Sequence, residues 1–395
     1  MRILIVPKDF PSEHRPGAGI FILRRAQALR DLGHDISVLR MVPAAPPFGR
    51  KWDAYRSIRQ IDSVDGIPVR TVRAIVPPRM IGMEYVHLQL RRALESEILR
   101  FKPDVVHASF LVPCGQLVAR QRIVPSVVTA HGIDAHKWPR LRPGLWRGSR
   151  EAVENADGVT AVSGYIADRL RELYPRDVRV IWNGADERFF YPRDRAASRR
   201  ALDLPLDRGI LAFVGNLLPV KGVADLLQAT QRISPDRRPL LAIGGSGPEL
   251  ESLRATAQQL NVEARFLGHL ETERIAHLVG SADAVTLPSY AEGLPNVICE
   301  AMLSERAVVA TTVGGIPEIV QDGKSGLLVP PGSPSELAVA LDTLFQDSAL
   351  RDAMAREGRA FALNHLTWRV SAKAYEAFYN EVINLPRRER AYASS

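Results

Sequence analysis

The sequence predicts an α/β protein built from two domains, each with a mainly parallel sheet. Three observations support this prediction. The chain has 395 residues, which exceeds the size at which a single hydrophobic core stops growing. Short apolar runs rich in β-branched residues alternate with helix-length segments, a pattern typical of βαβ units. This alternation stops after residue 186 and starts again at residue 210.

The first domain is expected over residues 1–186. It begins with a buried strand over 2–6, a loop rich in proline and glycine, and a helix over about 20–32. Further apolar runs predict strands at 35–40, 103–109, 126–132, 157–163 and 178–184. Alternation of this kind favours a parallel sheet with helices on both faces.

Residues 187–208 are charged, contain prolines and lack hydrophobic periodicity, so we expect a linker there. The second domain is expected over residues 209–369. Its predicted strands lie at 210–215, 240–245, 265–270 and 283–288, and another begins at 307. From 334 to 385 the pattern predicts successive amphipathic helices, the last carrying Trp368, Tyr375, Phe378 and Tyr379.

The composition is that of a soluble enzyme, with 46% hydrophobic and 24% charged residues, and it excludes a disordered or fibrous chain. Cys114 and Cys299 are too few for a disulfide framework or a cysteine-based zinc site, and they suit a reducing cytoplasm. The N-terminal apolar run is short and reads as a strand rather than a signal peptide. No apolar stretch reaches the length of about 18 residues that a membrane span needs.

The net charge of +8 is concentrated in the first half of the chain. Residues 1–190 contain 30 Lys and Arg against 20 Asp and Glu, a net of +10, and the remainder contains 22 against 24, a net of −2. Nucleic acid, an anionic membrane surface or an anionic substrate would each explain this, as would an arginine-rich bias without a partner.

Two basic segments in this half mix charge with apolar residues. They are residues 80–94, and residues 137–150 with Trp138 and Trp146. Such mixing suits the interface of an anionic bilayer. The alternative is a solvated basic face with the tryptophans packed inward. RNA could use the same mixture, but no recognised RNA-binding motif accompanies it.

The most informative stretch is residues 288–302, PSYAEGLPNVICEAM. A buried strand is followed by a polar loop with Glu292 and then by a helix with Pro295 at its first position and Glu300 about one turn in. The free N–H groups of the helix start, those of Leu294, Asn296 and Val297, are suited to an anion such as a diphosphate. The two carboxylates suit sugar hydroxyls instead. The alternative is a capping acid followed by a solvated helix glutamate.

Other turns at predicted strand ends add to this pattern. Gly17 and Gly19 lie in the first loop, Gly215 and Asn216 open a loop that ends at Lys221, and Gly245 and Gly314 follow later strands. Lys221 is suited to a diphosphate as a mobile point charge. Taken together, these turns predict a nucleotide pocket more strongly than any one of them does. His131 directly follows a buried strand, at an end where α/β sheets bind ligands, although a lone histidine is more often a core or surface residue.

As they stand, these residues resemble the retaining GT-B glycosyltransferases of glycosyltransferase family 4. The resemblance covers nearly the whole chain through motifs in order: GAG, HGID, NGADERFF, GNLLPVKG, GGSGPEL, FLGHL, EGLPNVICE, GGIPEIV and GLLVPPGSPSEL. It implies two Rossmann-like domains facing each other across a cleft, with the last helix, about 370–388, crossing back to the first domain. It also implies transfer of a hexose-type sugar from a nucleotide diphosphate sugar with retention of its anomeric configuration.

The resemblance also implies roles for individual residues. Glu300 holds the donor ribose, Glu292 contacts the donor sugar, and Lys221 holds the diphosphate. His131 hydrogen-bonds the donor sugar, so His131, Glu292 and Lys221 are the expected catalytic residues. The expected donor-binding residues are Gly19, Gly215, Asn216, Lys221, Gly245, Gly268, Glu292, Gly293, Leu294, Pro295, Asn296 and Glu300.

One departure from the family pattern is Asn216, which stands where many members carry an arginine that pairs with the lysine on the diphosphate. No Asp-x-Asp motif is present, so no metal or other cofactor is expected. We expect the departing diphosphate to help deprotonate the acceptor hydroxyl, with no enzyme nucleophile.

The partners expected from the resemblance are a UDP- or GDP-sugar and an acceptor. The first loop, FPSEHRPGAGIFILRRAQAL, is similar to bacterial cell-envelope and exopolysaccharide transferases. A lipid-linked or polysaccharide acceptor is therefore expected, in the cytoplasm and at the inner face of the cytoplasmic membrane. Nucleic acid is not an expected partner. The alternatives are a nucleotide-sugar epimerase of GT-B-like architecture and a binding-only subunit.

Overall fold

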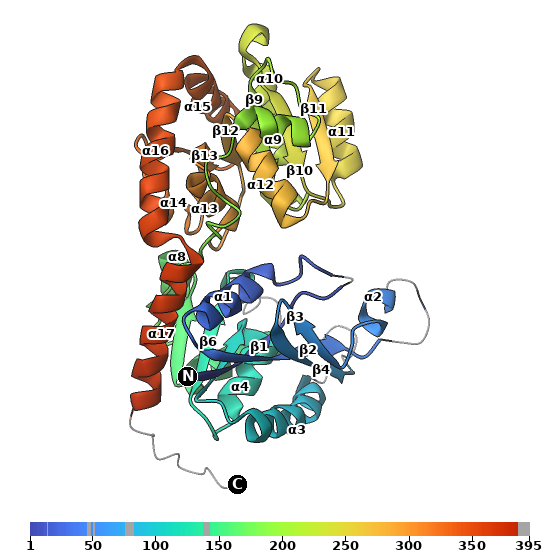
Figure 1. Ribbon diagram of the computed structural model, residues 1–395, viewed down its shortest axis with the longest axis vertical. Coiled ribbons are helices and arrows are strands. Elements are labelled where there is room, and N and C mark those ends of the chain that lie inside the picture. The colour runs from blue at the N-terminus through green and yellow to red at the C-terminus, as the bar shows by residue number, and fades with distance from the viewer. Residues whose placement is uncertain (14, 46–48, 50–51, 76–82, 137–142, 386–395) are drawn as a thin grey trace. The chain divides into compact units, whose positions relative to one another are not determined.

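The computed structural model describes residues 1–395 except 14, 46–48, 50–51, 76–82, 137–142 and 386–395. Within it the chain forms two compact units (Figure 1). The first unit contains residues 1–161, 167–181 and 372–395, and the second contains 162–166 and 182–371. The chain therefore leaves the first unit, builds the second, and returns to the first at its end.

The first unit is organised around an eight-stranded sheet with the order β3-β4-β2-β1-β5-β6-β7-β8. Its strands are β1 (Arg2–Pro7), β2 (Asp35–Pro43), β3 (Ile61–Val64), β4 (Ile67–Ala74), β5 (Val105–Ser109), β6 (Ser126–Ala130), β7 (Gly158–Ala161) and β8 (Arg179–Val180). The helices of this part of the chain are α1 (Ile20–Asp31), α2 (Asp53–Arg56), α3 (Met83–Phe101), α4 (Gln116–Arg120), α5 (Ile133–His136), α7 (Pro143–Asn155) and α8 (Gly164–Leu173), with a π-helical turn η3 (Leu111–Gly115) before α4.

Covering helices explain why the central strands are buried. Residues 3–6 of β1 and all of β5 are buried, as expected for parallel strands with helices on both faces. Helix α1 lies on one face of this sheet, and α3 and α4 lie on the other (Figure 1). The predicted mainly parallel sheet is thus confirmed.

One edge of the first sheet differs from the prediction, which expected only strands alternating with helices. Strands β3 and β4 form an antiparallel hairpin, and β4 then pairs in parallel with β2. Asp65 and Gly66 connect the hairpin strands, both with positive φ angles, of 49° and 78°. An Asp-Gly pair between alternating apolar residues is the local signal for such a hairpin.

The second unit contains a six-stranded parallel sheet with the order β11-β10-β9-β12-β13-β14. Its strands are β9 (Ile210–Val214), β10 (Leu240–Gly244), β11 (Ala264–Gly268), β12 (Ala284–Leu287), β13 (Ala307–Thr311) and β14 (Leu327–Val329). The helices of this part of the chain are α9 (Arg195–Ala201), α10 (Val223–Arg232), α11 (Leu250–Gln259), α12 (Thr272–Ser281), α13 (Asn296–Leu303), α14 (Ile316–Ile319), α15 (Pro334–Gln346), α16 (Ser348–His365) and α17 (Trp368–Asn384), and the 3₁₀ turns are η4 (Pro219–Lys221) and η5 (Pro235–Arg237).

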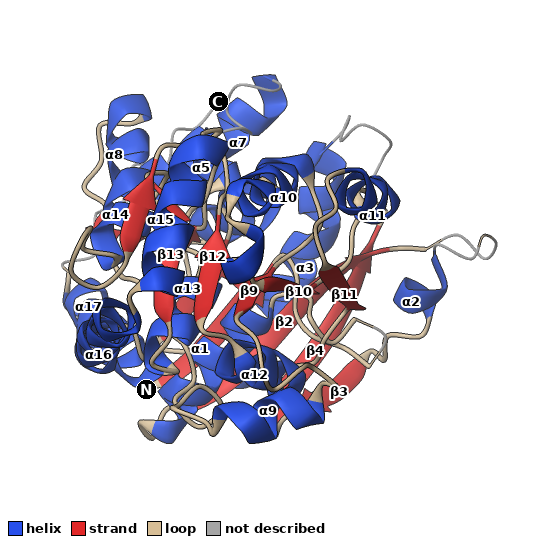
Figure 2. Cartoon of the chain, turned by 90° about the horizontal axis from the view of Figure 1, so that it is seen from above, coloured by secondary structure: helices blue, strands red, loops and turns tan. Residues whose placement is uncertain are grey.

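Helices pack around this second sheet in pairs. Helix α10 contacts α11 and α15, whereas α12 contacts α9 and α13. Figure 2 shows β9, β10, β12 and β13 enclosed by these helices. Strands β10 and β12 are buried along their whole length. The sheet therefore forms the core of the second unit, and the loops at the strand ends lie on this core.

The segment expected as a linker, residues 187–208, contains helix α9. Asp194 caps this helix by accepting a hydrogen bond from the backbone N–H of Ala197 at 2.6 Å. Arg199 is buried and donates to Asp283 at 2.9 Å. A charged helix held by a buried ion pair shows no apolar stripe, which is why hydrophobic periodicity did not predict it.

The last helix, α17, supplies aromatic side chains to the core of the first unit. Arg25 of α1 is 1% exposed and donates to the Tyr375 hydroxyl at 3.2 Å and to Ser109 at 2.6 Å. His107 of β5 hydrogen-bonds the Tyr379 hydroxyl at 2.6 Å. The predicted return of the last helix to the first domain is therefore confirmed by its contacts with α1 and β5.

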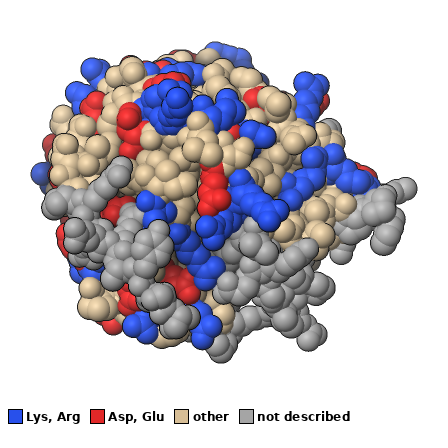
Figure 3. Space-filling model, turned by 90° about the horizontal axis from the view of Figure 1, so that it is seen from below, with Lys and Arg blue, Asp and Glu red and all other residues tan. Residues whose placement is uncertain are grey.

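Of the two basic segments, residues 80–82 and 137–142 lie outside the described part of the chain, and so does Trp138. Trp146 in α7 is 40% exposed, and Arg150 lies over its ring at 5.4 Å, so Trp146 is not packed inward. Figure 3 shows Lys and Arg side chains interspersed with Asp and Glu on the face seen from below. No helix within the described residues is long and apolar enough to cross a bilayer.

Candidate donor-sugar site

Glu292 lies in the loop between β12 and α13. Two hydrogen-bond donors hold its side chain in place. Its Oε1 atom accepts from Lys221 Nζ at 2.6 Å and from Ser289 Oγ at 2.7 Å. The Glu292 side chain is 9% exposed and that of Lys221 is 22% exposed. This ion pair is partly exposed, so a polar ligand can reach the Lys221 ammonium group and replace Glu292 as its partner.

Lys221 lies at the end of η4, in the loop that follows β9. The next residue, Gly222, has a φ angle of +66°, and a Cβ atom there would lie 2.1 Å from the carbonyl oxygen of Pro288. The backbone N–H of Tyr290 also donates to the carbonyl of Val220 at 2.8 Å. Glycine at 222 therefore lets the Lys221 loop pack directly on the Glu292 loop.

Glycine also brings the loop after β13 against Glu292. Gly314 has a φ angle of +58°, and a Cβ atom there would lie 2.0 Å from the Glu292 carbonyl oxygen. The N–H of Gly315 donates to the carbonyl of Gly293 at 2.9 Å. The loops after β9, β12 and β13 thus form one layer at the carboxyl edge of the sheet.

Three more predicted glycines lie at the same edge, at the ends of neighbouring strands. A Cβ atom at Gly245 would lie 1.8 Å from the carbonyl oxygen of Gly215. The N–H of Gly245 donates to the carbonyl of Gly268 at 2.7 Å. Gly215, Gly245 and Gly268 are therefore brought together by backbone contacts. Asn216 is exposed, and its carbonyl oxygen accepts a hydrogen bond from the N–H of Leu218 at 3.0 Å.

Helix α13 begins one residue later than predicted. Pro295 is its N-cap rather than its first helical residue, with Asn296 as the first. The N–H groups of Asn296 and Val297 have no preceding helical carbonyl to bond. Glu300 follows in the same helix, half-buried. Backbone N–H groups without helical partners therefore lie between Glu292 and Glu300 in the sequence, at the predicted helix start.

His131 lies in the first unit, directly after β6. Its ring lies between the rings of Phe21 and Phe110, with centroids at 4.9 and 4.7 Å. The Nε2 atom is enclosed and has no hydrogen-bond partner among the described residues. Burial, and secondarily the charge of Arg25, lower the pKa of His131 well below its ordinary value of 6.5. The imidazole is therefore neutral at neutral pH.

Asp134 fixes the backbone around His131. One of its carboxylate oxygens accepts from the N–H groups of His131 and Gly132 at 3.0 and 2.9 Å, and the other accepts from the N–H of Leu111 at 3.1 Å. Burial raises the pKa of Asp134, and these backbone hydrogen bonds oppose that shift. Asp134 thus sets the loop that carries the imidazole.

Gly19 lies at the start of α1 in the first unit. Its φ angle is +66°, and a Cβ atom there would lie 2.2 Å from the carbonyl oxygen of Asp9. The glycine is required by the close approach of two loop segments within this unit.

Sequence reasoning missed three groups that position the predicted residues. Ser289 donates to Glu292, Asp134 orders the His131 loop, and Phe21 packs against the imidazole. Ser289 and Asp134 each stand three residues from the residue they support, a spacing that could have drawn attention to them. Phe21 is distant in sequence, and only the fold brings it to His131.

These observations define a class of protein. Two units with parallel, helix-covered sheets, a last helix returning to the first unit, and a lysine–glutamate pair beside a helix start together describe a GT-B transferase that uses a nucleotide sugar. Apart from Gly19, the predicted donor-binding residues belong to the second unit.

Comparison with known proteins agrees with this class. The family model "Glycosyltransferase Family 4" matches residues 16–189, and "Glycosyl transferases group 1" matches residues 194–361. The D-inositol 3-phosphate glycosyltransferase of Corynebacterium jeikeium is 35% identical, with 97% of each chain covered. The putative teichuronic acid biosynthesis glycosyltransferase TuaC of Bacillus subtilis is 29% identical, covering 86% of this chain and 88% of TuaC.

A solved structure, Anabaena Alr3699/HepE in complex with UDP-glucose, shares the fold with a TM-score of 0.74 and 21% identity, covering 96% of this chain and 100% of that one. The chain belongs to glycosyltransferase family 4, and it is a retaining hexosyltransferase that takes its sugar from a nucleotide sugar.

Proposed function

We propose that this enzyme transfers a hexose from a UDP- or GDP-hexose to a hydroxyl of a lipid-linked or polysaccharide acceptor, without a divalent metal. The observation that carries the proposal is the pair formed by Lys221 and Glu292, 2.6 Å apart beside the start of α13. It provides one cation for a diphosphate and one carboxylate for a sugar hydroxyl at adjacent positions.

In this proposal the donor is held mainly by strand-end loops of the second unit. Lys221 and the N–H groups of Leu294 and Asn296 bind the diphosphate, because a helix start and an ammonium both favour negative charge. Glu300 accepts hydrogen bonds from the ribose hydroxyls, and Glu292 accepts from the sugar. The remaining donor-contact positions are Gly215, Asn216, Gly245, Gly268, Gly293 and Pro295.

Two further assignments lie in the first unit. We assign His131 as a hydrogen-bond partner of the donor sugar, a role that suits a neutral imidazole because it can donate from one ring nitrogen and accept at the other. Gly19 lets backbone of that unit approach the phosphate or the sugar, because it carries no side chain.

The transfer step follows from these charges. The bond between the anomeric carbon and the diphosphate oxygen breaks, and Lys221 and the α13 N–H groups stabilise the negative charge that develops on that oxygen. The acceptor hydroxyl attacks from the same face and gives its proton to the departing diphosphate. The configuration at the anomeric carbon is retained without a covalent intermediate on the enzyme.

The proposed acceptor class rests on the relatives and on charge. TuaC is named for teichuronic acid biosynthesis, and the D-inositol 3-phosphate glycosyltransferase is named for a phosphorylated acceptor. The net charge of +10 over residues 1–190 favours an anionic acceptor or an anionic membrane surface. We propose that the enzyme works in the cytoplasm, at the inner face of the membrane.

A panel of nucleotide sugars tests the donor. Thermal unfolding is measured with UDP- and GDP-linked glucose, mannose, hexuronate and N-acetylhexosamine. The true donor stabilises the folded state by about 2.7 kcal/mol at a hundred times its Kd. That donor is then incubated with lipid-linked and polysaccharide acceptors, and the anomeric configuration of the product is determined by NMR. An inverted product, or transfer that requires added Mg²⁺ or Mn²⁺, contradicts the proposal.

A further inference from the structure

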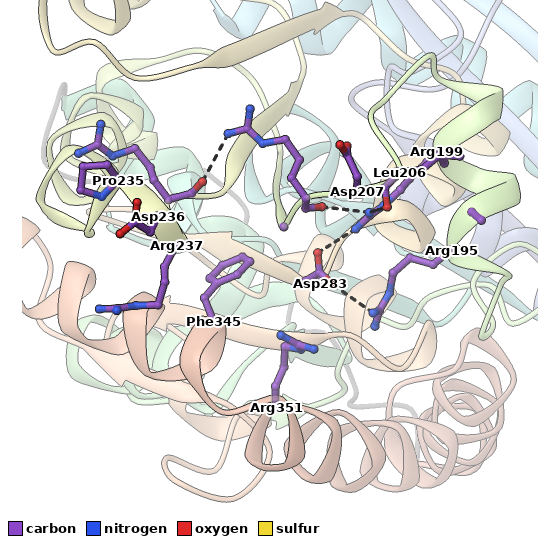
Figure 4. A pocket seen from close by; sticks show the side chains of 14 residues that line it. Arg195, Arg199, Leu206, Asp207, Pro235, Asp236, Arg237, Asp283, Phe345 and Arg351 are labelled. Atoms are coloured by element: carbon purple, nitrogen blue, oxygen red, sulfur yellow. Dashed lines mark hydrogen bonds and ion pairs between the residues drawn. The ribbon is translucent and has the colours of Figure 1, made fainter.

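The second unit carries a hollow of about 930 Å³ that the transfer reaction does not use (Figure 4). Six arginines line it against three aspartates. The arginines are Arg195, Arg199, Arg208, Arg237, Arg238 and Arg351. Such an excess of guanidinium groups in a concave surface is suited to an anion.

The hollow is distinct from the proposed donor site. Gly209 and Asp283, which line it, directly precede strands β9 and β12. Lys221 and Glu292 lie in the loops that follow those same two strands. The hollow is therefore at the amino edge of the sheet, and the donor loops are at its carboxyl edge.

Several of the six arginines already have defined structural roles. Arg208 and Arg237 pair with Glu263 and Asp342. Arg199 is 7% exposed and donates to Asp283 and to the carbonyls of Ser281, Leu206 and Arg208. Arg238 donates to the carbonyls of Gln231, Ile233 and Asn261. These four side chains already bind protein groups, so we assign them a structural role in the wall of the hollow.

Arg195 and Arg351 differ from this group. Arg195 shares Asp283 with Arg199, at 3.0 Å, so one carboxylate is divided between two guanidinium groups. The Arg351 side chain is 12% exposed and its Nη1 atom donates to the carbonyl of Leu344 at 3.2 Å, but its Nε atom is buried without a hydrogen-bond partner among the described residues. The Asp352 carboxylate lies 3.7 Å from that nitrogen, beyond hydrogen-bonding distance.

The side chains of Arg195 and Arg351 lie close to the same part of the hollow. In Figure 4 the guanidinium groups of Arg195 and Arg351 point toward the same space beside Asp283. The charge of Arg195 also acts on the neighbouring Arg306, whose pKa is lowered to about 10 by burial first and by Arg195 second. A buried N–H donor without a partner is costly, and an anion between the two arginines would satisfy it.

The lining of the hollow is partly apolar. Leu206, Pro235 and Phe345 line the hollow together with the arginines. We propose that this hollow is a second ligand site, in which Arg195 and Arg351 bind the phosphate of a small phosphorylated molecule whose organic part lies against Phe345 and Pro235. Binding there is independent of the donor, because the two sites lie at opposite edges of the sheet.

Calorimetric titration with glucose 6-phosphate, inorganic phosphate and glucose, at low salt, tests this proposal. It uses the full chain carrying Lys221→Ala, which removes the cation of the donor site. We expect glucose 6-phosphate to bind, glucose not to bind, and affinity to fall about tenfold with Arg351→Gln or Arg195→Gln, the loss of one charge-assisted hydrogen bond. Equal affinity for inorganic phosphate would identify free phosphate as the ligand, and tighter binding of the ester would identify a phosphorylated metabolite.

Arg356→Gln is the matched control. Arg356 lies on the same helix as Arg351, is exposed and does not line the hollow. The proposal is overturned if glucose 6-phosphate does not bind at millimolar concentration, or if Arg351→Gln and Arg195→Gln bind it as Arg356→Gln does. Thermal unfolding checks that each variant is folded. If Arg351→Gln is unfolded, Arg195→Gln decides, because the Arg195 side chain is 37% exposed and its loss leaves Arg199 on Asp283.

Discussion

The Nζ atom of Lys221 lies 2.6 Å from Oε1 of Glu292, and these two residues come from the loops after neighbouring strands β9 and β12. The lysine is therefore neutralised by the protein itself before a donor arrives. In the proposed function, a diphosphate has to compete with Glu292 for the ammonium group. The ion pair neutralises the half-buried cation without a ligand, and under this proposal Glu292 becomes available to sugar hydroxyls when Lys221 binds the phosphate.

Replacing Lys221 by alanine removes the proposed cation of the leaving group. We expect kcat to fall by about 10²-fold or more, as for other preorganised charge stabilisers. Steady-state kinetics with the identified donor measure this effect. Lys324→Ala is the control, because Lys324 is 63% exposed and pairs with Glu357. A kcat for Lys221→Ala within a factor of about two of wild type contradicts the assignment.

Replacing Ser289 by alanine removes the second donor to Glu292. We expect kcat/KM to fall about tenfold, the value of one hydrogen bond to a charged group. The matched control is Thr286→Val, which removes a buried hydroxyl that has no hydrogen-bond partner in the described part of the chain. We expect Thr286→Val to retain activity. Equal activity losses in the two variants would show that Ser289 acts through general packing and not through Glu292.

Replacing Gly314 by alanine tests the contact between two donor loops. A Cβ atom there would lie 2.0 Å from the Glu292 carbonyl, at a φ angle of +58°. Gly323→Ala is the control, because Gly323 has a similar φ angle of +73° and nothing within 4 Å. We expect about 1 kcal/mol of destabilisation at 323 from the left-handed backbone alone, and about 3 kcal/mol or more at 314. Urea unfolding measures both, and equal values would refute the contact.

His107 predicts a loss of stability in mild acid. Burial, and then the charge of Arg25, lower its pKa well below 6.5. Below about pH 6.5 the histidine binds a proton in the unfolded chain but not in the folded chain. The contribution of His107 to the free energy of unfolding is therefore complete above that pH and is lost as the pH falls below it. The slope is about 1.4 kcal/mol per pH unit for one such group.

Thermal unfolding between about pH 7.5 and pH 5.5 measures this effect. We expect the midpoint to fall less steeply with pH in His107→Gln than in wild type, although His107→Gln is less stable at neutral pH. His269→Gln, at a side chain that is 61% exposed, should keep the wild-type slope. A slope for His107→Gln equal to that of His269→Gln would contradict the burial of a neutral imidazole.

Local patterns were sufficient to predict the strands and the turns that follow them. Strand β12, the Glu292 loop and α13 follow from one apolar run, one polar loop and one proline, and the prediction was wrong only in making Pro295 the first helical residue. The same reasoning missed the strands β3, β4 and β14 and the helix α9. Strands β3 and β14 are short edge strands and α9 is a charged helix, so each carries little hydrophobic periodicity.

Contacts between distant residues could not be predicted in this way. Ser289 is a neighbour of Glu292 in sequence, but Lys221 is 71 residues from it, and Arg25 is 350 residues from Tyr375. The resemblance to a known family gave Lys221 and Glu292 a shared role before any distance was known. It gave none to Arg351, whose place beside Asp283 depends on how α16 packs in the second unit.

The return of helix α17 to the first unit affects the order in which the chain can fold. Phe378 and Val382 fill the space above Gly158, and Tyr375 and Tyr379 take up hydrogen bonds of Arg25 and His107. All four side chains belong to the last tenth of the sequence. During synthesis, the first sheet therefore emerges from the ribosome before the helix that completes its core. Until that helix is in place, Arg25 and His107 lack their tyrosine partners, so the core of the first unit is completed only after the second unit has been synthesised.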